Sequence, residues 1–496
     1  MTDDGRTSTT IERFPTGIAG LDTILQGGLY RGSVYLFLAK PGTGKTILGN
    51  QLCFSHVAAG GRAVVVTLLT ESHSRLIAHL RPFAFFDPAS VGAGLSYVTG
   101  YQALESGKLK GLLSLLRQVV RDQKATLLVL DGFVTAGAMS ESELDVKKFV
   151  HELQSFVELI GCTTILLTGA SDAGVQYAVR TMVDGLVELH VDSAGMAAVR
   201  SLEVTKSRGS AALMGRHPFE ITDAGVTVFP RMESHVGKLV SRDDSLVGAP
   251  VAEFGIAGLD AMFGGGVRRG SLTLVLGAPA SGKTLVGLNL LAEGARQSER
   301  GLYFGFFEAA VDLRERARAT GLDLSDFEAA GLIDMMWQSP VDAIADALAV
   351  RLVTTLRERG IRRLVIDGLG GFKDSLVFAE RWGRFFLALS HELRAMGVVT
   401  ILTDETRTLG EFEIPGHGLT AMLDNILCLR HVEVRTGIRR VLSIIKQRDG
   451  VGDTSPHAFS IDARGIVVSP AHGARATGGS RKGAKATKGR RRPSGR

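Results

Sequence analysis

The sequence predicts an α/β protein of two similar tandem domains with mainly parallel sheets, followed by a basic tail. Two observations carry this prediction. Apolar runs of strand length alternate with helical patterns along the chain, which is typical of parallel sheets covered by helices. In addition, the hexapeptide Gly17–Asp22 is repeated without change as Gly255–Asp260, 238 residues further on. The 496 residues are enough for two large domains, which we place at 1–240 and 241–472, with the tail at 473–496.

The second copy contains a glycine-rich loop, Gly277–Thr284, between an apolar run and a helix start. The loop fits the P-loop pattern G-x-x-x-x-G-K-[ST], whose backbone N–H groups bind phosphate oxygens. In such a loop the lysine reaches the β- and γ-phosphates, and the hydroxyl that follows it binds Mg²⁺. We therefore expect ATP and Mg²⁺ to be held by Ser281, Gly282, Lys283 and Thr284.

The first copy repeats this loop at Ala39–Thr46, after the apolar run Val34–Leu38. Alanine replaces the first glycine, and we expect little cost if its φ angle is negative. The expected phosphate-binding residues are Gly42, Thr43, Gly44, Lys45 and Thr46, with Thr46 also on the metal.

An aspartate ends a buried apolar strand in each half, as in the Walker B element that supports Mg²⁺. In the first half a strand at Ala63–Leu69 and an amphipathic helix near 108–123 precede Thr126–Asp131. In the second half the matching strand ends at Asp367. A further strand follows at 163–168 and 398–403; its threonines could face the γ-phosphate or simply lie in the core.

The catalytic base must come from another strand, because glycine follows both Walker B aspartates. The candidates are Glu308, after Tyr303–Phe307, and Glu71, after the strand at 64–69. They lie 25 and 26 residues beyond their P-loop lysines. Since a one-residue slip reverses the face of a strand, Glu71 could be misplaced, and the first domain could bind ATP without efficient hydrolysis. Solvent-exposed acids remain the alternative for both positions.

The charge and the cysteine content limit the classes of protein to which the chain can belong. The formal net charge is +6, but nine basic residues without an acid lie beyond Gly473, so the rest of the chain carries −3. We expect the tail to be disordered; it could bind nucleic acid or an acidic partner, or be merely solvated. The three cysteines lack metal-binding spacing, and no apolar run could span a bilayer. A soluble, cytoplasmic protein is expected.

The doubled P-loop, the G-I-x-G-L-D lead-in and the position of the base resemble the KaiC family of tandem RecA-like ATPases. The family's K-x-R element is matched at Lys206–Arg208 and Lys446–Arg448, and its closing segment at 218–226 and 459–465. The resemblance implies homohexamers with nucleotide at the subunit interfaces. It implies that Lys206, Arg208, Lys446 and Arg448 reach the γ-phosphate held by a neighbouring subunit, and that Asp223 and Asp462 lie at the nucleotide.

Two departures from the family qualify this resemblance. Active halves of the family carry paired glutamates at the base position, whereas Phe307 and Thr70 stand beside single glutamates here. Where clock members phosphorylate two adjacent hydroxyl residues, this chain has Thr420 followed by Ala421, so only Thr420 could be an acceptor. The leading hypothesis is an ATP-hydrolysing ring that could act as a serine/threonine autokinase and as a signalling or timing scaffold for an unknown partner. The alternatives are a nucleic-acid-dependent motor and a nucleotide-gated assembly without hydrolysis.

Overall fold

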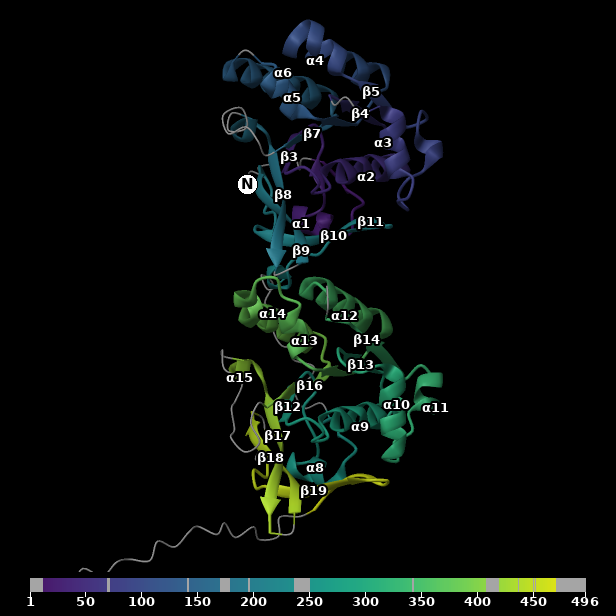
Figure 1. The fold of residues 1–496 in the computed structure, drawn as a ribbon, viewed down its shortest axis with the longest axis vertical. Helices are drawn as coiled ribbons and strands as arrows, with labels where there is room; N and C mark the ends of the chain where they lie inside the picture. Colours follow the sequence, from purple (N-terminus) through teal and green to yellow (C-terminus); the bar gives the residue numbers. More distant parts are fainter. Residues whose placement is uncertain are drawn as a thin grey trace, which may run out of the picture.

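The computed structural model shows two lobes stacked along the long axis of the molecule (Figure 1). It describes residues 12–68, 72–140, 142–169, 179–194, 197–235, 250–340, 343–406, 419–435, 437–448, 450 and 452–469. Within these residues no helix is long and apolar enough to cross a membrane. Each lobe is built on one nine-stranded sheet, and this confirms the predicted pair of α/β domains.

The first sheet has the strand order β11-β10-β9-β8-β3-β7-β6-β4-β5. The strands from β8 to β5 are parallel, and the last three along the chain are added antiparallel at one edge. The bounds are β3 Val34–Ala39, β4 Ala63–Thr67, β5 Leu95–Thr99, β6 Leu127–Asp131, β7 Thr163–Gly169, β8 Gly185–Ala194, β9 Ala197–Ser207, β10 Arg216–Thr222 and β11 Gly225–Val228. A separate pair joins β1 Arg13–Phe14 to β2 Leu29–Tyr30.

The second sheet repeats this topology in the order β14-β13-β15-β16-β12-β17-β18-β19-β20. Again the sheet is parallel up to β17 and antiparallel beyond it. The bounds are β12 Leu272–Gly277, β13 Gly301–Gly305, β14 Ile333–Trp337, β15 Arg363–Asp367, β16 Val399–Glu405, β17 Asn425–Val434, β18 Gly437–Gln447, β19 His457–Asp462 and β20 Gly465–Val468.

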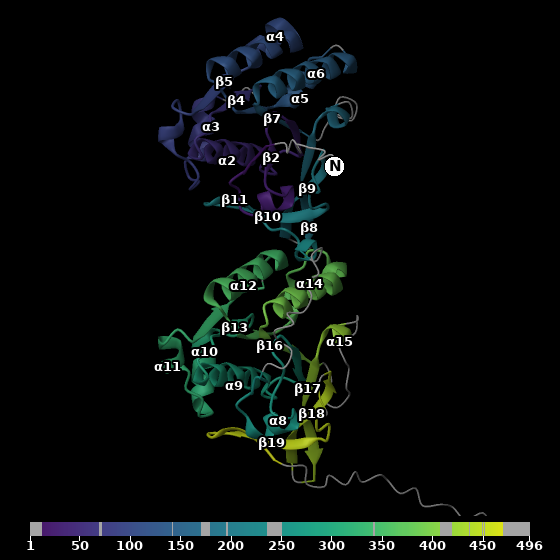
Figure 2. The ribbon, with the colours of Figure 1, turned by 180° about the vertical axis from the view of Figure 1, so that it is seen from behind.

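Helices cover both faces of each sheet, so the parallel strands are buried apolar runs, as expected for this architecture (Figure 2). The helices of the first domain are α1 Leu21–Leu25, α2 Lys45–Ala58, α3 His73–Leu80, α4 Tyr101–Asp122, α5 Phe133–Ala138 and α6 Glu143–Ile160. Those of the second are α8 Ala257–Met262, α9 Lys283–Arg296, α10 Ala310–Ala319, α11 Ser325–Ala329, α12 Ala345–Arg359, α13 Gly370–Asp374, α14 Trp382–Ala395 and α15 Leu419–Met422. Short 3₁₀ turns lie at Pro88–Ser90 (η1), Met232–His235 (η2) and Ala379–Arg381 (η4).

Three predicted elements differ in their limits. The strand expected at Ala63–Leu69 ends at Thr67, and the strand expected at Tyr303–Phe307 runs from 301 to 305. The helix expected near 108–123 begins at Tyr101 and contains one non-helical residue, Lys108. Both strands end where their neighbours also end, because Thr67 pairs with Asp131 and Gly305 pairs with Asp367.

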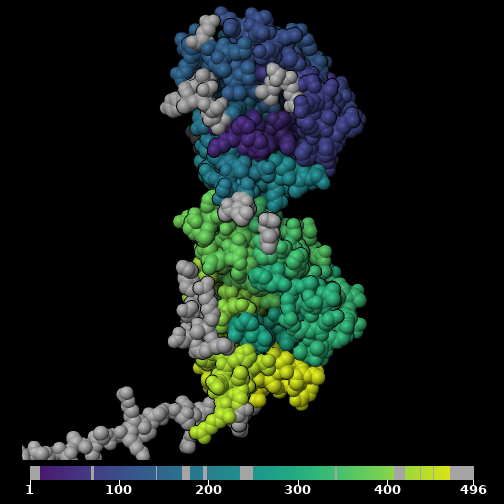
Figure 3. Space-filling view, in the orientation of Figure 1, coloured from purple at the N-terminus to yellow at the C-terminus, as the bar shows by residue number. Residues whose placement is uncertain are grey.

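The lobes meet where η2, at the end of the first domain, packs on α12 and α14 of the second (Figure 3). The Met232 side chain is buried in the core of the second domain. Its backbone N–H donates to Asp346, and Arg381 forms ion pairs with both Asp346 and Glu233. Since Asp346 is almost fully buried, this junction is a packed interface with paired charges, rather than a loose tether.

Candidate nucleotide-binding site

The P-loop of the second domain connects the end of β12 to the start of α9, at the carboxyl edge of the sheet. Gly282 has φ 104°, which turns the loop into the helix. The Lys283 ammonium group donates to the carbonyls of Gly277 at 2.9 Å and Ala278 at 3.0 Å. It also lies 3.8 Å from Glu405. Burial lowers the pKa of Lys283, and the neighbouring Glu405 and Asp367 carboxylates oppose that effect.

The P-loop of the first domain lies at the equivalent place, between β3 and α2. Ala39 is not among the described residues with positive φ, so the expectation that alanine fits there is confirmed. The two loops differ at another position: Gly42 has φ 79°, whereas its counterpart Ala280 has φ 58°. Left-handed φ angles strain any residue with a Cβ, so the second loop contains a local strain that the first avoids.

The hydroxyl that follows each P-loop lysine contacts the Walker B aspartate of the same domain. Thr46 Oγ1 donates to Asp131 Oδ2 at 2.8 Å, and Thr284 Oγ1 donates to Asp367 Oδ2 at 2.9 Å. Strand register explains the pairing, because each aspartate ends a parallel strand beside the P-loop edge. Hydroxyl and carboxylate oxygens are ligands that Mg²⁺ prefers, so these residues fit the predicted metal.

Two further hydroxyl groups contact Asp367 and were missed from the sequence. Tyr303 donates to Oδ2 and Thr403 donates to Oδ1, while Thr403 Oγ1 accepts the Gly368 N–H at 2.8 Å. The sequence allows Thr403 either a phosphate-side or a core role, and its contact places it at the Walker B carboxylate. Only strand register reveals these contacts, since Tyr303 and Thr403 lie on different strands.

The candidate base Glu308 lies three residues beyond the end of β13, in the turn that leads to α10. Its side chain is partly exposed and forms an ion pair with Arg316 of α10. The expectation that Glu308 directly follows the strand was therefore wrong, and the alternating faces of a strand do not determine its position. Glu71 falls outside the described residues.

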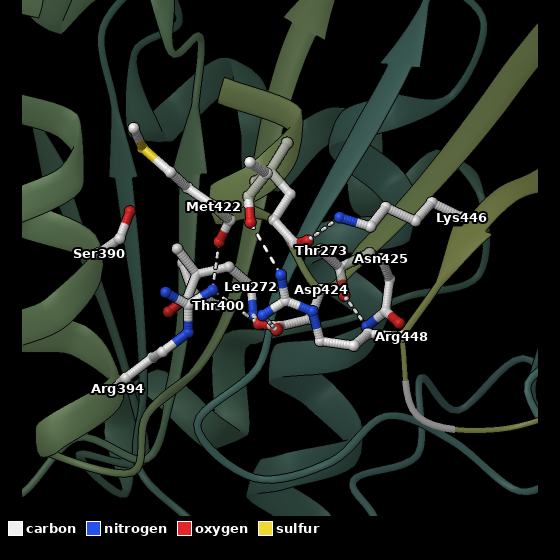
Figure 4. Close-up of polar contacts among 12 residues, drawn as sticks. Leu272, Thr273, Ser390, Arg394, Thr400, Met422, Asp424, Asn425, Lys446 and Arg448 are labelled. Atoms are coloured by element: carbon white, nitrogen blue, oxygen red, sulfur yellow. Dashed lines mark hydrogen bonds and ion pairs between the residues drawn. The ribbon is translucent and has the colours of Figure 1, made fainter. Parts of the chain in front are cut away.

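The Lys-x-Arg elements lie at the amino end of the parallel strands, opposite the end that carries the P-loop. Figure 4 shows Lys446 and Arg448 of the second domain beside Asp424 and Leu272. Lys446 donates to the carbonyls of Thr420 at 2.6 Å and Leu423 at 2.7 Å. Arg448 donates to the Ala421 carbonyl at 2.8 Å and lies 3.3 Å from Asp424. In both elements burial and the adjacent arginine lower the pKa of the lysine.

The first domain repeats this arrangement. Lys206 donates to the carbonyls of Arg180 at 3.1 Å and Thr181 at 2.8 Å, and Arg208 lies 3.5 Å from Asp184. Asp184 accepts the N–H of Val34, just as Asp424 accepts that of Leu272, the first residue of the strand before the P-loop. Each element is thus anchored at the start of that strand, away from the loop at its end.

The closing hairpin of each domain packs beside its P-loop. A Cβ on Gly44 would meet Ile221 Cδ1 at 2.4 Å, and one on Gly282 would meet Ile461 Cδ1 at 2.7 Å. Asp223 and Asp462 lie in these hairpins, one or two residues beyond the isoleucines, and Asp462 pairs with Arg464, so their place at the nucleotide stays a prediction. The contact of the hairpin also explains why glycine precedes each P-loop lysine.

A P-loop, a hydroxyl–aspartate pair and a parallel sheet extended by antiparallel strands define each half as a RecA-like P-loop ATPase domain. The family model for the KaiC ATPase matches residues 14–233 and 252–473, and the chain therefore belongs to the KaiC ATPase family.

Curated relatives match over nearly the whole chain. It is 26% identical to the circadian clock oscillator protein KaiC of Rippkaea orientalis over 475 residues, which cover 93% of this chain and 89% of the relative. It is also 26% identical to the circadian clock oscillator protein KaiC 1 of Synechocystis, covering 92% and 88%, and 25% identical to KaiC of Nostoc, covering 92% and 89%. These matches do not favour the alternative of a nucleic-acid motor.

Proposed function

We propose that the protein is a ring-forming ATPase that binds Mg²⁺·ATP at both P-loops and hydrolyses it at subunit interfaces. The observation that carries this proposal is the repeated contact of a P-loop hydroxyl with the Walker B aspartate, Thr46 with Asp131 and Thr284 with Asp367. When bound, Mg²⁺ neutralises charge on the β- and γ-phosphates. The protein supplies the Lys45 and Lys283 ammonium groups and a preformed hydroxyl–carboxylate pair that orients the metal shell.

A ring is supported by the place of the Lys-x-Arg elements. Asp424, which contacts Arg448, binds the first residue of β12, and the P-loop follows the last. Five residue steps along a strand span about 17 Å, so Lys446 and Arg448 lie too far from their own nucleotide site. In a closed ring with head-to-tail interfaces they would face the nucleotide of the next subunit, where two cations stabilise transition-state charge. A hexamer is the ring size that we propose.

The second domain is the better candidate for phosphoryl transfer. Its base candidate, Glu308, lies in the turn that follows β13, the strand that carries Tyr303 beside Asp367. Thr420 lies in α15, and its carbonyl binds Lys446, so an acceptor there would sit beside a neighbour's γ-phosphate. We therefore propose autokinase activity on Thr420 in trans and a signalling or timing role with a protein partner, in the cytoplasm. The tail at 473–496 lies outside the described residues, and its binding of nucleic acid or of an acidic partner stays a prediction.

The test compares ATP turnover and mass by size exclusion for the wild type, Lys45→Ala, Lys283→Ala and the double variant. The double variant should lose turnover, because neither site retains its phosphate-binding cation. Lys283→Ala should lose more turnover than Lys45→Ala, and Lys45→Ala should have the larger effect on ATP-dependent assembly. Full turnover in the double variant would refute the proposal, and assembly without turnover in the wild type would favour the non-hydrolysing alternative.

A further inference from the structure

The two Walker B aspartates have different surroundings, and this difference separates the two nucleotide sites. In the second domain Asp367 accepts hydrogen bonds from three hydroxyl groups, those of Thr284, Tyr303 and Thr403. Thr284 belongs to the P-loop and has a counterpart in Thr46. Tyr303 and Thr403 come from the two strands that flank Asp367, β13 and β16.

The equivalent positions in the first domain carry no hydroxyl. Strand register identifies them: Tyr303 pairs with Val365 as Val65 pairs with Val129, and Val275 pairs with Thr403 as Phe37 pairs with Leu167. Val65 and Leu167 are both buried apolar residues of the core. Neither can donate a hydrogen bond, so this pair of contacts is specific to the second domain.

Tyr303 is placed so that its hydroxyl serves Asp367. Its side chain is 2% exposed and belongs to the apolar core beneath β12 and α9. The Tyr303 hydroxyl donates to Asp367, because a carboxylate oxygen can only accept. Thr403 is 1% exposed, and the Gly368 N–H fixes its oxygen. Both carboxylate oxygens of Asp367 are therefore held by rigid, buried donors.

We propose that Tyr303 is a positioning residue that fixes Asp367 and strengthens Mg²⁺ binding at the second site. This inference rests on the proposed binding of Mg²⁺·nucleotide. A carboxylate held in one orientation loses no freedom when it accepts a hydrogen bond from metal-bound water. Residues that hold a metal ligand in place without contacting the metal typically contribute about 10- to 100-fold to metal affinity.

The test measures binding of a fluorescent ATP analogue by full-length variants that share Lys45→Ala, so that only the second site is read. Each is titrated with Mg²⁺, and nucleotide affinity is also measured in EDTA. Tyr303→Phe should raise the half-saturating Mg²⁺ concentration about tenfold and leave the affinity in EDTA unchanged. Thr403→Val should shift it in the same direction. The matched control is Tyr97→Phe, which removes a half-buried phenol hydroxyl that donates to Asn50 at 2.8 Å in the first domain.

A second control keeps only the first site: in a Lys283→Ala background, Tyr303→Phe should leave the half-saturating Mg²⁺ concentration unchanged. A shift below twofold for Tyr303→Phe in the Lys45→Ala background would overturn the role of Tyr303. So would a loss of affinity that is equal with and without Mg²⁺, or a similar shift in Tyr97→Phe. Absence of nucleotide binding in the Lys45→Ala parent would instead overturn the proposed function itself, so the two failures are distinguishable.

Discussion

Mixed rings offer a decisive measurement of whether Lys446 and Arg448 act across a subunit interface. One variant carries Lys283→Ala and keeps its Lys-x-Arg element, and the other carries Lys446→Ala with Arg448→Ala and keeps its P-loop. Each alone should lack turnover in the second domain, because every site then lacks one of its two parts. Co-assembly of the two variants should restore turnover if each site takes its P-loop and its cations from different subunits.

The size of the restored activity follows from the geometry. The element is anchored through Asp424 at Leu272, and the P-loop begins at Gly277, about 17 Å along the same strand. In an equal mixture half of the subunits keep the P-loop, and half of their neighbours keep the element. About a quarter of the interfaces in a closed ring are then complete, whatever the ring size. Turnover of the second domain should return to about a quarter of the wild-type value.

The assay uses two affinity tags, so that only mixed assemblies are collected, and counts phosphate released per subunit. Turnover from the first domain is subtracted by using the homogeneous Lys283→Ala protein. A mixture of tagged Lys283→Ala with untagged Lys283→Ala controls for the purification. If mixed assemblies show no more turnover than the average of the two parent proteins, the elements do not act in trans and the spatial reasoning is wrong.

Three predictions concern stability, each read from chemical unfolding of the whole chain. Ala280→Gly should stabilise the second domain by about 1 kcal/mol, because it relieves the φ of 58°, and Gly42→Ala should destabilise the first by a similar amount; equal effects of the same sign would refute this. Burial, with nearby guanidinium groups, lowers the pKa of His217 to about 4 from 6.5, so the unfolded state binds more protons between these values. Stability should therefore fall by roughly 1 kcal/mol per pH unit from pH 6.5 to 4, and His217→Gln should flatten that slope. Arg381→Ala should cost about 3 kcal/mol, since it leaves Asp346 buried without its cation; a cost below about 1 kcal/mol would contradict the burial.

Much of the fold and the P-loop half of each site could be predicted because their chemistry lies in short, contiguous patterns. The loops at 39–46 and 277–284, and the aspartates that end β6 and β15, need only local spacing to be identified. The internal repeat then confirmed each weak pattern with a second copy. The same repeat predicted the two-domain organisation before any strand order was known.

Contacts between strands could not be predicted, because they depend on register. Tyr303 and Thr403 are separated by a hundred residues, and only the pairing of β13, β15 and β16 brings them to Asp367. Glu405 was missed for a related reason: β16 runs two residues further than expected and reaches the level of Gly277. Conversely, β13 ends early, because Gly305 is its last paired residue, and this places Glu308 in a turn.

The junction between the lobes uses a pair of charged residues that the first domain does not repeat. The offset of 236 residues between the Walker B aspartates identifies Lys110 and Asp145 as the counterparts of Asp346 and Arg381, with the charges reversed. In the first domain this place is an open pocket of about 330 Å³ between α4 and α6. The acidic Glu233 that pairs with Arg381 at the junction would therefore meet a like-charged residue, Asp145, at the counterpart position. The charge pattern thus favours docking of the acidic η2 segment on the second domain over the first.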